Sequence, residues 1–106
     1  MKLSYNLMPL SFQNMRPVAL ASERAGLHSV AVADSPLISR ELFMSCAECL
    51  RETKSLNVMT AVTNPLTRHP SVAASAIATL CEMAPGRLLV GIATGDSAAW
   101  GAGLRP

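Results

Sequence analysis

The polar side chains with the clearest chemical potential lie in one short segment. Residues 63–71 read TNPLTRHPS, in which the polar groups beside and between two prolines are Asn64, Thr67, Arg68 and His69. They can contact an anionic or planar ligand, and the first amides of a helix after Pro70 would add donors. A plainer interpretation is a stiff loop in which Asn64 forms an Asx turn and Arg68 is solvated. The residues alone leave both interpretations open.

Three side chains are candidates for acid–base chemistry at the ends of expected strands. Asp34 ends the second strand, His69 follows the third and Asp96 ends the fourth. A carboxylate at such a position can act as a general acid or base, or accept a hydrogen bond from a ligand hydroxyl. For Asp34 we favour capping of the following helix. Asp96 lies in GIATGDS, whose glycines let the backbone approach a ligand closely. Asp96 and His69 are therefore the catalytic candidates.

The cysteines predict no metal site. The motif CAEC, from Cys46 to Cys49, lies inside a helical pattern, where both sulfurs share a face as small apolar groups. A structural zinc site needs four ligands, and Cys81 supplies at most one more. We therefore expect no metal.

Apolar runs and helical patterns alternate along the whole chain. The strands are expected over 2–8, 29–34, 57–62 and 87–93. The helices are expected over 16–25, over 39–53 with Ser39 as N-cap, and from Pro70 to the APGR motif. The third helix should bury one stripe, made of Ala73, Ala76, Ile77, Leu80 and Met83.

This alternation predicts a single parallel α/β domain over residues 1–106. The expected strands begin about 28 residues apart, which is the length of one strand and one crossover helix. The segments that lead from helix to strand are short and plain, whereas those from strand to helix are longer and hold the unusual polar groups. In parallel α/β folds the ligand lies at the carboxyl ends of the strands, beside these longer segments.

Composition excludes several classes of function. Half of the 106 residues are apolar and the formal net charge is +2, as in an ordinary packed domain. The nine Lys and Arg residues are scattered singly, so we expect no nucleic-acid partner. No apolar run reaches the roughly 18 residues of a membrane span, and no signal peptide is recognisable. We therefore expect a cytoplasmic protein.

Three stretches of the sequence resemble a known family. They are AGLHSVAVADSP, TAVTNPLTRHPSVAASAIATL and APGRLLVGIATGDSA. Together they resemble, in the same order, the luciferase-like flavin- or deazaflavin-dependent oxidoreductases, which include monooxygenases and methylene-tetrahydromethanopterin reductases. The resemblance implies the first half of a TIM (β/α)8 barrel, strands one to four, that binds reduced FMN or coenzyme F420 and oxidises or reduces a small organic substrate.

The resemblance also implies a site. A non-prolyl cis peptide would fall between Ala61 and Val62, and the cofactor ring would lie against Thr60, Ala61, Val62 and Asn64. Asp96 aligns with an acidic residue that lines the site in the reductase branch. The chain departs from the family where it has Asn6 in place of a glutamate on the first strand, and Ala31 in place of an aromatic residue on the second.

Four strands are only half of a barrel that needs about 250 residues. An isolated sheet of this kind would leave the first and fourth strands unpaired and its inward face uncovered. We therefore expect pairing of two half-barrels, as a homo-oligomer or with a partner chain. A non-catalytic half-barrel that acts only through such association is the alternative to a cofactor-dependent oxidoreductase.

Overall fold

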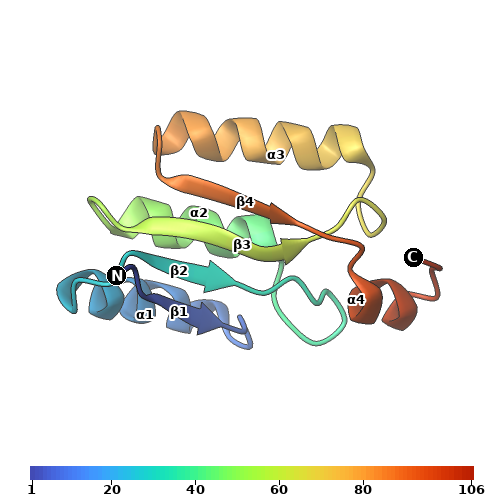
Figure 1. Ribbon diagram of the computed structural model, residues 1–106, viewed down its shortest axis with the longest axis horizontal. Coiled ribbons are helices and arrows are strands. Elements are labelled where there is room, and N and C mark those ends of the chain that lie inside the picture. The colour runs from blue at the N-terminus through green and yellow to red at the C-terminus, as the bar shows by residue number, and fades with distance from the viewer.

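The computed structural model describes residues 1–106 as alternating strands and helices (Figure 1). The strands are β1 (Ser4–Leu7), β2 (Ser29–Val32), β3 (Asn57–Thr63) and β4 (Leu88–Ile92). The helices are a short 3-10 helix, η1 (Phe12–Asn14), and α1 (Met15–Arg24), α2 (Leu42–Glu52), α3 (Pro70–Met83) and α4 (Asp96–Gly101). The strands form one parallel sheet in the order β1-β2-β3-β4, which confirms the expected parallel α/β fold.

The largest error in a predicted boundary is at the start of α2. We expected a helix over 39–53 with Ser39 as its N-cap. The helix begins at Leu42 instead, because the Glu41 carboxylate accepts a hydrogen bond of 2.7 Å from the Met44 amide and so caps the first turn. Ser39 donates its hydroxyl to a carbonyl in the preceding turn. Helix α4 was not predicted at all.

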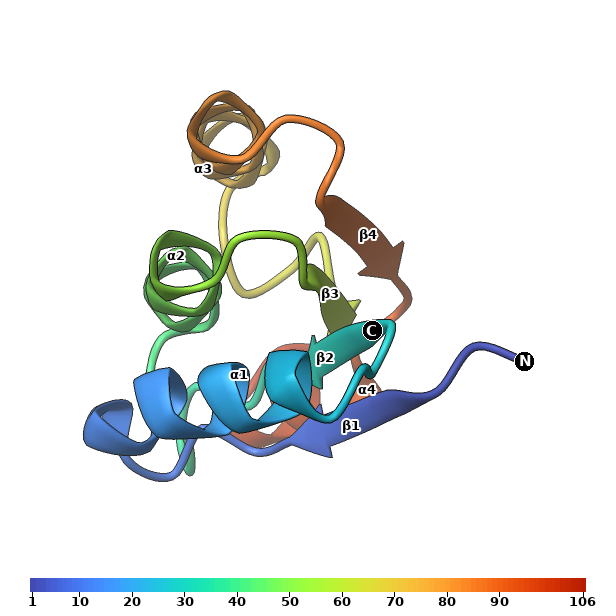
Figure 2. The same ribbon diagram turned by 90° about the vertical axis from the view of Figure 1, so that its left-hand side faces the viewer.

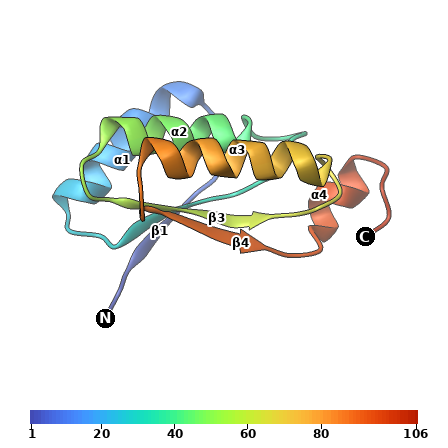
Figure 3. The same cartoon turned by 90° about the horizontal axis from the view of Figure 1, so that it is seen from above.

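Helices α1, α2 and α3 all cover the same face of the sheet (Figures 2 and 3). The core between these two layers is apolar, and its fully buried members include Met15, Val30, Val32, Leu42 and Val58. None of the helices has the length and apolar character needed to cross a membrane. Of the stripe predicted on α3, Leu80 is buried and Ala73, Ala76 and Ile77 pack against the core, but Met83 is 46% exposed.

The other face of the sheet is bare, as expected for half of a barrel. Strands β1 and β4 are the two edges, and each pairs with a neighbour on one side only. Leu88 of β4 packs against the core, whereas the next residue, Leu89, is 37% exposed. The chain therefore presents two open strand edges and a largely uncovered inner face.

Glu23, in the last turn of α1, holds the segment between α2 and β3. One oxygen of its carboxylate accepts hydrogen bonds from the amides of Lys54, Ser55 and Leu56, at 2.9, 2.7 and 3.1 Å. The amide of Ser55 makes the largest contribution in lowering the pKa of Glu23 below its usual value of 4.5. A lowered folded-state pKa means that the ionised carboxylate stabilises the fold.

This contact predicts a specific loss of stability in acid. The stabilisation by Glu23 is complete above pH 4.5 and is lost as the pH falls through the lower, folded-state pKa. Glu23→Gln should therefore lower the urea concentration at the unfolding midpoint at pH 7. Between pH 5 and pH 3 the midpoint of this variant should decrease less than that of the wild-type chain. Glu82→Gln, at an exposed position of α3, is the matched control. Equal pH dependence in the two variants would contradict the assignment.

Candidate functional site

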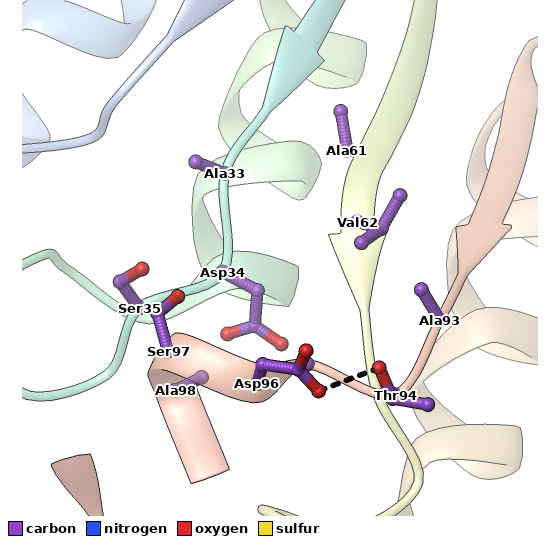
Figure 4. A pocket seen from close by; sticks show the side chains of 11 residues that line it. Ala33, Asp34, Ser35, Ala61, Val62, Ala93, Thr94, Asp96, Ser97 and Ala98 are labelled. Carbon is purple, nitrogen blue, oxygen red and sulfur yellow. Dashed lines mark hydrogen bonds between the residues drawn. The ribbon is translucent and has the colours of Figure 1, made fainter. Parts of the chain in front are cut away.

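The carboxyl ends of the strands surround a hollow of about 440 Å³ (Figure 4). Its walls come from the ends of β2, β3 and β4 and from the first turn of α4. The lining residues are Ala33, Asp34, Ser35, Ala61, Val62, Ala93, Thr94, Gly95, Asp96, Ser97 and Ala98. The hollow lies where the longer strand-to-helix connections were expected to place a ligand, and its volume is in the range of small-molecule sites.

Asp34 lines the hollow, but its carboxylate is fully engaged. Its side chain is 1% exposed and accepts a hydrogen bond of 2.9 Å from the Thr63 hydroxyl. Arg68 donates to both carboxylate oxygens, at 2.6 and 3.2 Å. The predicted helix-capping role of Asp34 is therefore wrong, and so is a solvated Arg68. A loop after β3 and a loop after β2 are joined by a buried ion pair instead.

Arg68 also contacts the start of α2. Its guanidinium donates to one oxygen of Glu41 at 2.6 and 3.1 Å, and lies 4.8 Å from the centre of the Phe43 ring. Burial tends to lower the pKa of Arg68, but the hydrogen bonds and charges of Asp34 and Glu41 outweigh burial and raise the pKa. Arg68 therefore stays charged, and it neutralises Asp34.

Asp96 is the second carboxylate of the hollow, and its surroundings differ. It is exposed at the first position of α4, and one of its oxygens accepts a hydrogen bond of 2.8 Å from the Thr94 hydroxyl (Figure 4). No cation pairs with it. Of the two carboxylates, only Asp96 has an oxygen available to exchange a proton with a ligand.

The bulge of β3 forms another wall. The peptide between Ala61 and Val62 is cis, as the family resemblance implied, and both residues line the hollow. The pairing register of β3 with β4 shifts between Thr60 and Thr63, which is where Ala61 and Val62 lie. Thr60 is fully buried, and its hydroxyl bonds to the amide and the carbonyl of Gly91, at 2.9 and 2.8 Å. Thr60 thus joins β3 to β4 and does not line the hollow.

Asn64 lies behind the hollow. Its side-chain oxygen accepts hydrogen bonds from the amides of Leu66 and Thr67, both at 2.9 Å, which is the expected Asx turn. The residue is 1% exposed, and its amide nitrogen has no hydrogen-bond partner. Its side chain packs against Gly95, which has a φ of 72° and no room for a Cβ. Asn64 itself does not line the hollow, whereas Gly95 does.

His69 lies outside the hollow. It is the exposed N-cap of α3, and its Nδ1 accepts a hydrogen bond of 3.2 Å from the Ser71 amide. The structure therefore brings Asp96, Ala61 and Val62 together, and keeps His69, Thr60 and Asn64 apart from them. The sequence analysis overlooked Thr94, Ser35 and Ser97, although each directly follows or precedes an aspartate or glycine of the strand ends.

The cysteines of α2 are buried and unreactive. Burial raises the pKa of Cys46, and it raises the pKa of Cys49 to about 11, so both thiols stay protonated at neutral pH. No cluster of three or more His, Cys, Asp or Glu side chains is arranged to hold a metal ion.

The sequence of the chain matches one known family along nearly its whole length. The profile of the luciferase-like monooxygenase family matches residues 3–102. The chain belongs to this family. Among curated luciferase-like relatives, it is 31% identical over 84 residues to a 5,10-methylenetetrahydromethanopterin reductase of Methanolobus tindarius, covering 79% of this chain and 26% of the relative. A reductase of the same name from Methanopyrus kandleri is 44% identical over 46 residues, or 43% of this chain and 13% of the relative.

Solved structures share the fold of the chain. The coenzyme F420-dependent tetrahydromethanopterin reductase of Methanopyrus kandleri superposes with a TM-score of 0.86 and 24% identity, over 95% of this chain and 29% of that one. An F420-dependent secondary alcohol dehydrogenase, solved with an F420–acetone adduct, superposes with a TM-score of 0.77 and 27% identity. The match covers 86% of this chain and 31% of the dehydrogenase. The monooxygenase RslO1 of Streptomyces bottropensis superposes with a TM-score of 0.76 and 22% identity. The match covers 87% of this chain and 32% of the monooxygenase. The luciferase-like chain thus holds four βα units of a TIM barrel and spans about a third or less of these structures.

The buried ion pair predicts a large difference between two arginines. Arg68→Met would leave Asp34 charged and buried without its partner, which should cost about 3 kcal/mol of the free energy of unfolding. The side chain of Arg16 is 61% exposed and forms an ion pair with Glu52. Arg16→Met removes this pair and should lower the free energy of unfolding by at most about 1 kcal/mol. Urea denaturation at pH 7 measures both. Adding Asp34→Asn to Arg68→Met should recover part of the loss, and equal losses for the two arginines would contradict the buried pair.

Proposed function

We propose that this chain forms the cofactor-facing half of a luciferase-like oxidoreductase that uses reduced F420 or FMN to convert a small organic substrate. One observation carries the proposal: the Asp96 carboxylate, which forms no ion pair, lines the same hollow as the small side chains of Ala61 and Val62. A carboxylate that could exchange a proton and a wall of small side chains thus face the same space. The names of the relatives favour F420, because two of the three solved structures depend on it.

The residues present fit a flat ring system. A second hollow of about 440 Å³ lies on the inner face of β1 to β3 and shares Ala33, Ala61 and Val62 with the first. Ala31 and Asn6 also line it, in place of the aromatic and acidic side chains expected there in relatives. Small side chains leave room for a planar group along the sheet. When bound, reduced F420 or FMN would supply the reducing electrons for the substrate.

The chain's own contribution is binding and proton handling. The backbone around Ala61 and Val62 would support the ring, and Asp96 would hold or exchange a proton at a substrate oxygen. Thr94 donates a hydrogen bond to one carboxylate oxygen of Asp96, which leaves the other oxygen available to contact a substrate. Asp34 cannot share this role, because Arg68 and Thr63 occupy its oxygens. The distance of His69 from the hollow favours Asp96 as the acid–base group.

Cofactor titration of the purified chain tests the proposal. F420 fluorescence and FMN fluorescence should both be followed, with quenching expected for the cofactor that is used. Ala33→Leu fills the region shared by the two hollows and should weaken binding at least tenfold. Ala74→Leu adds the same bulk at an exposed position of α3 and should leave binding unchanged. No spectral change with either cofactor up to millimolar concentration would reject the proposal for this chain.

A second candidate function follows from the open edges of the sheet. We propose that β1 and β4 pair with a second half-barrel. In a dimer, β4 of each copy can pair with β1 of the other, which closes the two sheets into one barrel and covers both inner faces. This association would stand on its own if no cofactor binds, as in a non-catalytic half-barrel.

Light scattering coupled to size-exclusion chromatography tests this pairing. The expected mass is twice 11.2 kDa. Leu89→Lys places a charge on the bare face and should shift the mass toward the monomer, because burial of an unpaired charge is costly. Met44→Lys, at a position 65% exposed on the helical layer, should leave the mass unchanged. A wild-type chain that stays monomeric at all concentrations would exclude self-pairing.

A further inference from the structure

Helix α4 has no polar contact with the other elements of the fold. Figures 1 and 3 show it beyond the ends of the strands, apart from the layer formed by α1, α2 and α3. Residues 96–106 make hydrogen bonds only with one another and with Thr94 and Gly95, and they form no ion pair. Helices α1 and α2, by contrast, are joined by the ion pair of Arg16 with Glu52 at 2.8 Å.

The apolar contacts of α4 are small as well. Of its residues only Ala98 and Ala99 are buried, whereas Trp100, its largest side chain, is 62% exposed. The helix also lines two cavities, the hollow at the strand ends and a smaller one of about 180 Å³ beside the loop between β2 and α2. Burial of two alanine side chains contributes little free energy, so α4 belongs to the weakly held part of the chain.

A glycine stands where α4 joins the sheet. Gly95 is the N-cap of α4 and has a φ of 72°, in the left-handed region that other residues disfavour. A Cβ on Gly95 would lie 2.4 Å from the Cβ atom and 2.8 Å from the Nδ2 atom of Asn64, so only glycine fits against this side chain. Hinges occur at such positions, at the end of an element and next to a weakly held segment.

A hydrogen-bond donor and an acceptor beside this glycine are both unpaired. The Nδ2 atom of Asn64 is buried and has no partner. The side chain is not free to turn toward one, because its Oδ1 atom is held by the amides of Leu66 and Thr67. The carbonyl of Thr94, which directly precedes Gly95, accepts no hydrogen bond. A buried donor without a partner is costly, so a movement that joins the two groups would lower the free energy.

We propose that α4 is a lid that closes the hollow by rotation of the peptide between Thr94 and Gly95. In the closed state the Thr94 carbonyl accepts a hydrogen bond from Nδ2 of Asn64, and the direction of α4 changes with the peptide. The inference rests on the proposed function for what the closed hollow holds. A group bound between α4 and the wall of Ala61 and Val62 contacts both, so its binding favours the closed state.

The lid would also regulate the carboxylate of the hollow. Asp96 is the first residue of α4 and is exposed in this structure. Its position therefore changes with that of the lid, and closure removes it from bulk water. A carboxylate that is enclosed only together with a bound group exchanges protons with that group and not with solvent.

Nuclear magnetic resonance relaxation dispersion of the ¹⁵N-labelled chain, recorded without cofactor, tests the inference. Exchange on the microsecond-to-millisecond timescale is expected for the amides of residues 95–103 and for the indole N–H of Trp100, the only Trp of the chain. The amides of α2 should show none. Flat dispersion profiles for residues 96–101 would overturn the proposal.

Two glycine variants separate the hinge from backbone strain. Gly95→Ala places a methyl group against Asn64, which blocks the approach of the Thr94 carbonyl to Nδ2 and should abolish the exchange of residues 96–101. Gly103→Ala is the matched control, because Gly103 has a φ of 74° but nothing lies within 4 Å of an added Cβ. This variant should keep the exchange of the wild-type chain. Equal exchange in the two variants would contradict a hinge at Gly95.

A further variant covers the case in which Gly95→Ala unfolds α4, seen as loss of the dispersed amide signals of residues 96–101. Asn64→Asp keeps the oxygen of the Asx turn but removes the donor, so the closed population should fall about fivefold. Asn57→Asp is its control, because Nδ2 of Asn57 donates to the His28 carbonyl at 3.0 Å, before the first turn of β3, and the exchange of α4 should persist. Unchanged exchange in Asn64→Asp would overturn the proposal.

The same chain separates this inference from the proposed function. Exchange of α4 in a chain that binds neither F420 nor FMN would support the lid and reject the proposed function. Cofactor binding by a chain with flat dispersion profiles would do the reverse.

Discussion

The buried ion pair between Asp34 and Arg68 is the constraint on which the rest of the site depends. It joins the loop after β2 to the loop after β3 across 34 positions of sequence, and Glu41 extends it to the start of α2. The pair is costly to desolvate and is stabilised only because every oxygen of Asp34 is occupied. One carboxylate of the hollow therefore holds the two loops together, whereas the other, Asp96, forms no ion pair and accepts a hydrogen bond from Thr94 at only one oxygen.

Local pattern was enough to predict the fold. Apolar residues repeat about every two residues in strands and every 3.6 residues in helices, so both kinds of element can be recognised in the sequence. Their alternation at regular spacing then predicts a parallel sheet. The Asx turn of Asn64 was also within reach, because it depends on neighbours two and three residues away. The start of α2 was misplaced because Glu41, a less usual cap, replaced the expected Ser39. Helix α4 has only six residues in a glycine-rich stretch, which is less than two helical turns and too short for an apolar repeat to be recognised.

The contacts that define the site lie beyond local pattern. The pairing of Arg68 with Asp34 follows from the register of β2 and β3 and from the path of two loops, neither of which periodicity reveals. The separation of His69 from the hollow has the same origin, since the residue turns outward to cap α3. The cis peptide was expected only because of the resemblance to the luciferase-like family, and nothing in the types of Ala61 and Val62 would indicate it.

Helix α4 joins two cavities of the protein. Its first residue, Asp96, lines the hollow at the strand ends, and its last, Gly101, lines a smaller cavity of about 180 Å³ beside the loop after β2. Five steps along an α-helix rise about 7.5 Å, and the backbone hydrogen bonds fix this rise. The separation of the two cavities is therefore set by the backbone of α4, so a side-chain substitution in one of them should leave the position of the other unchanged.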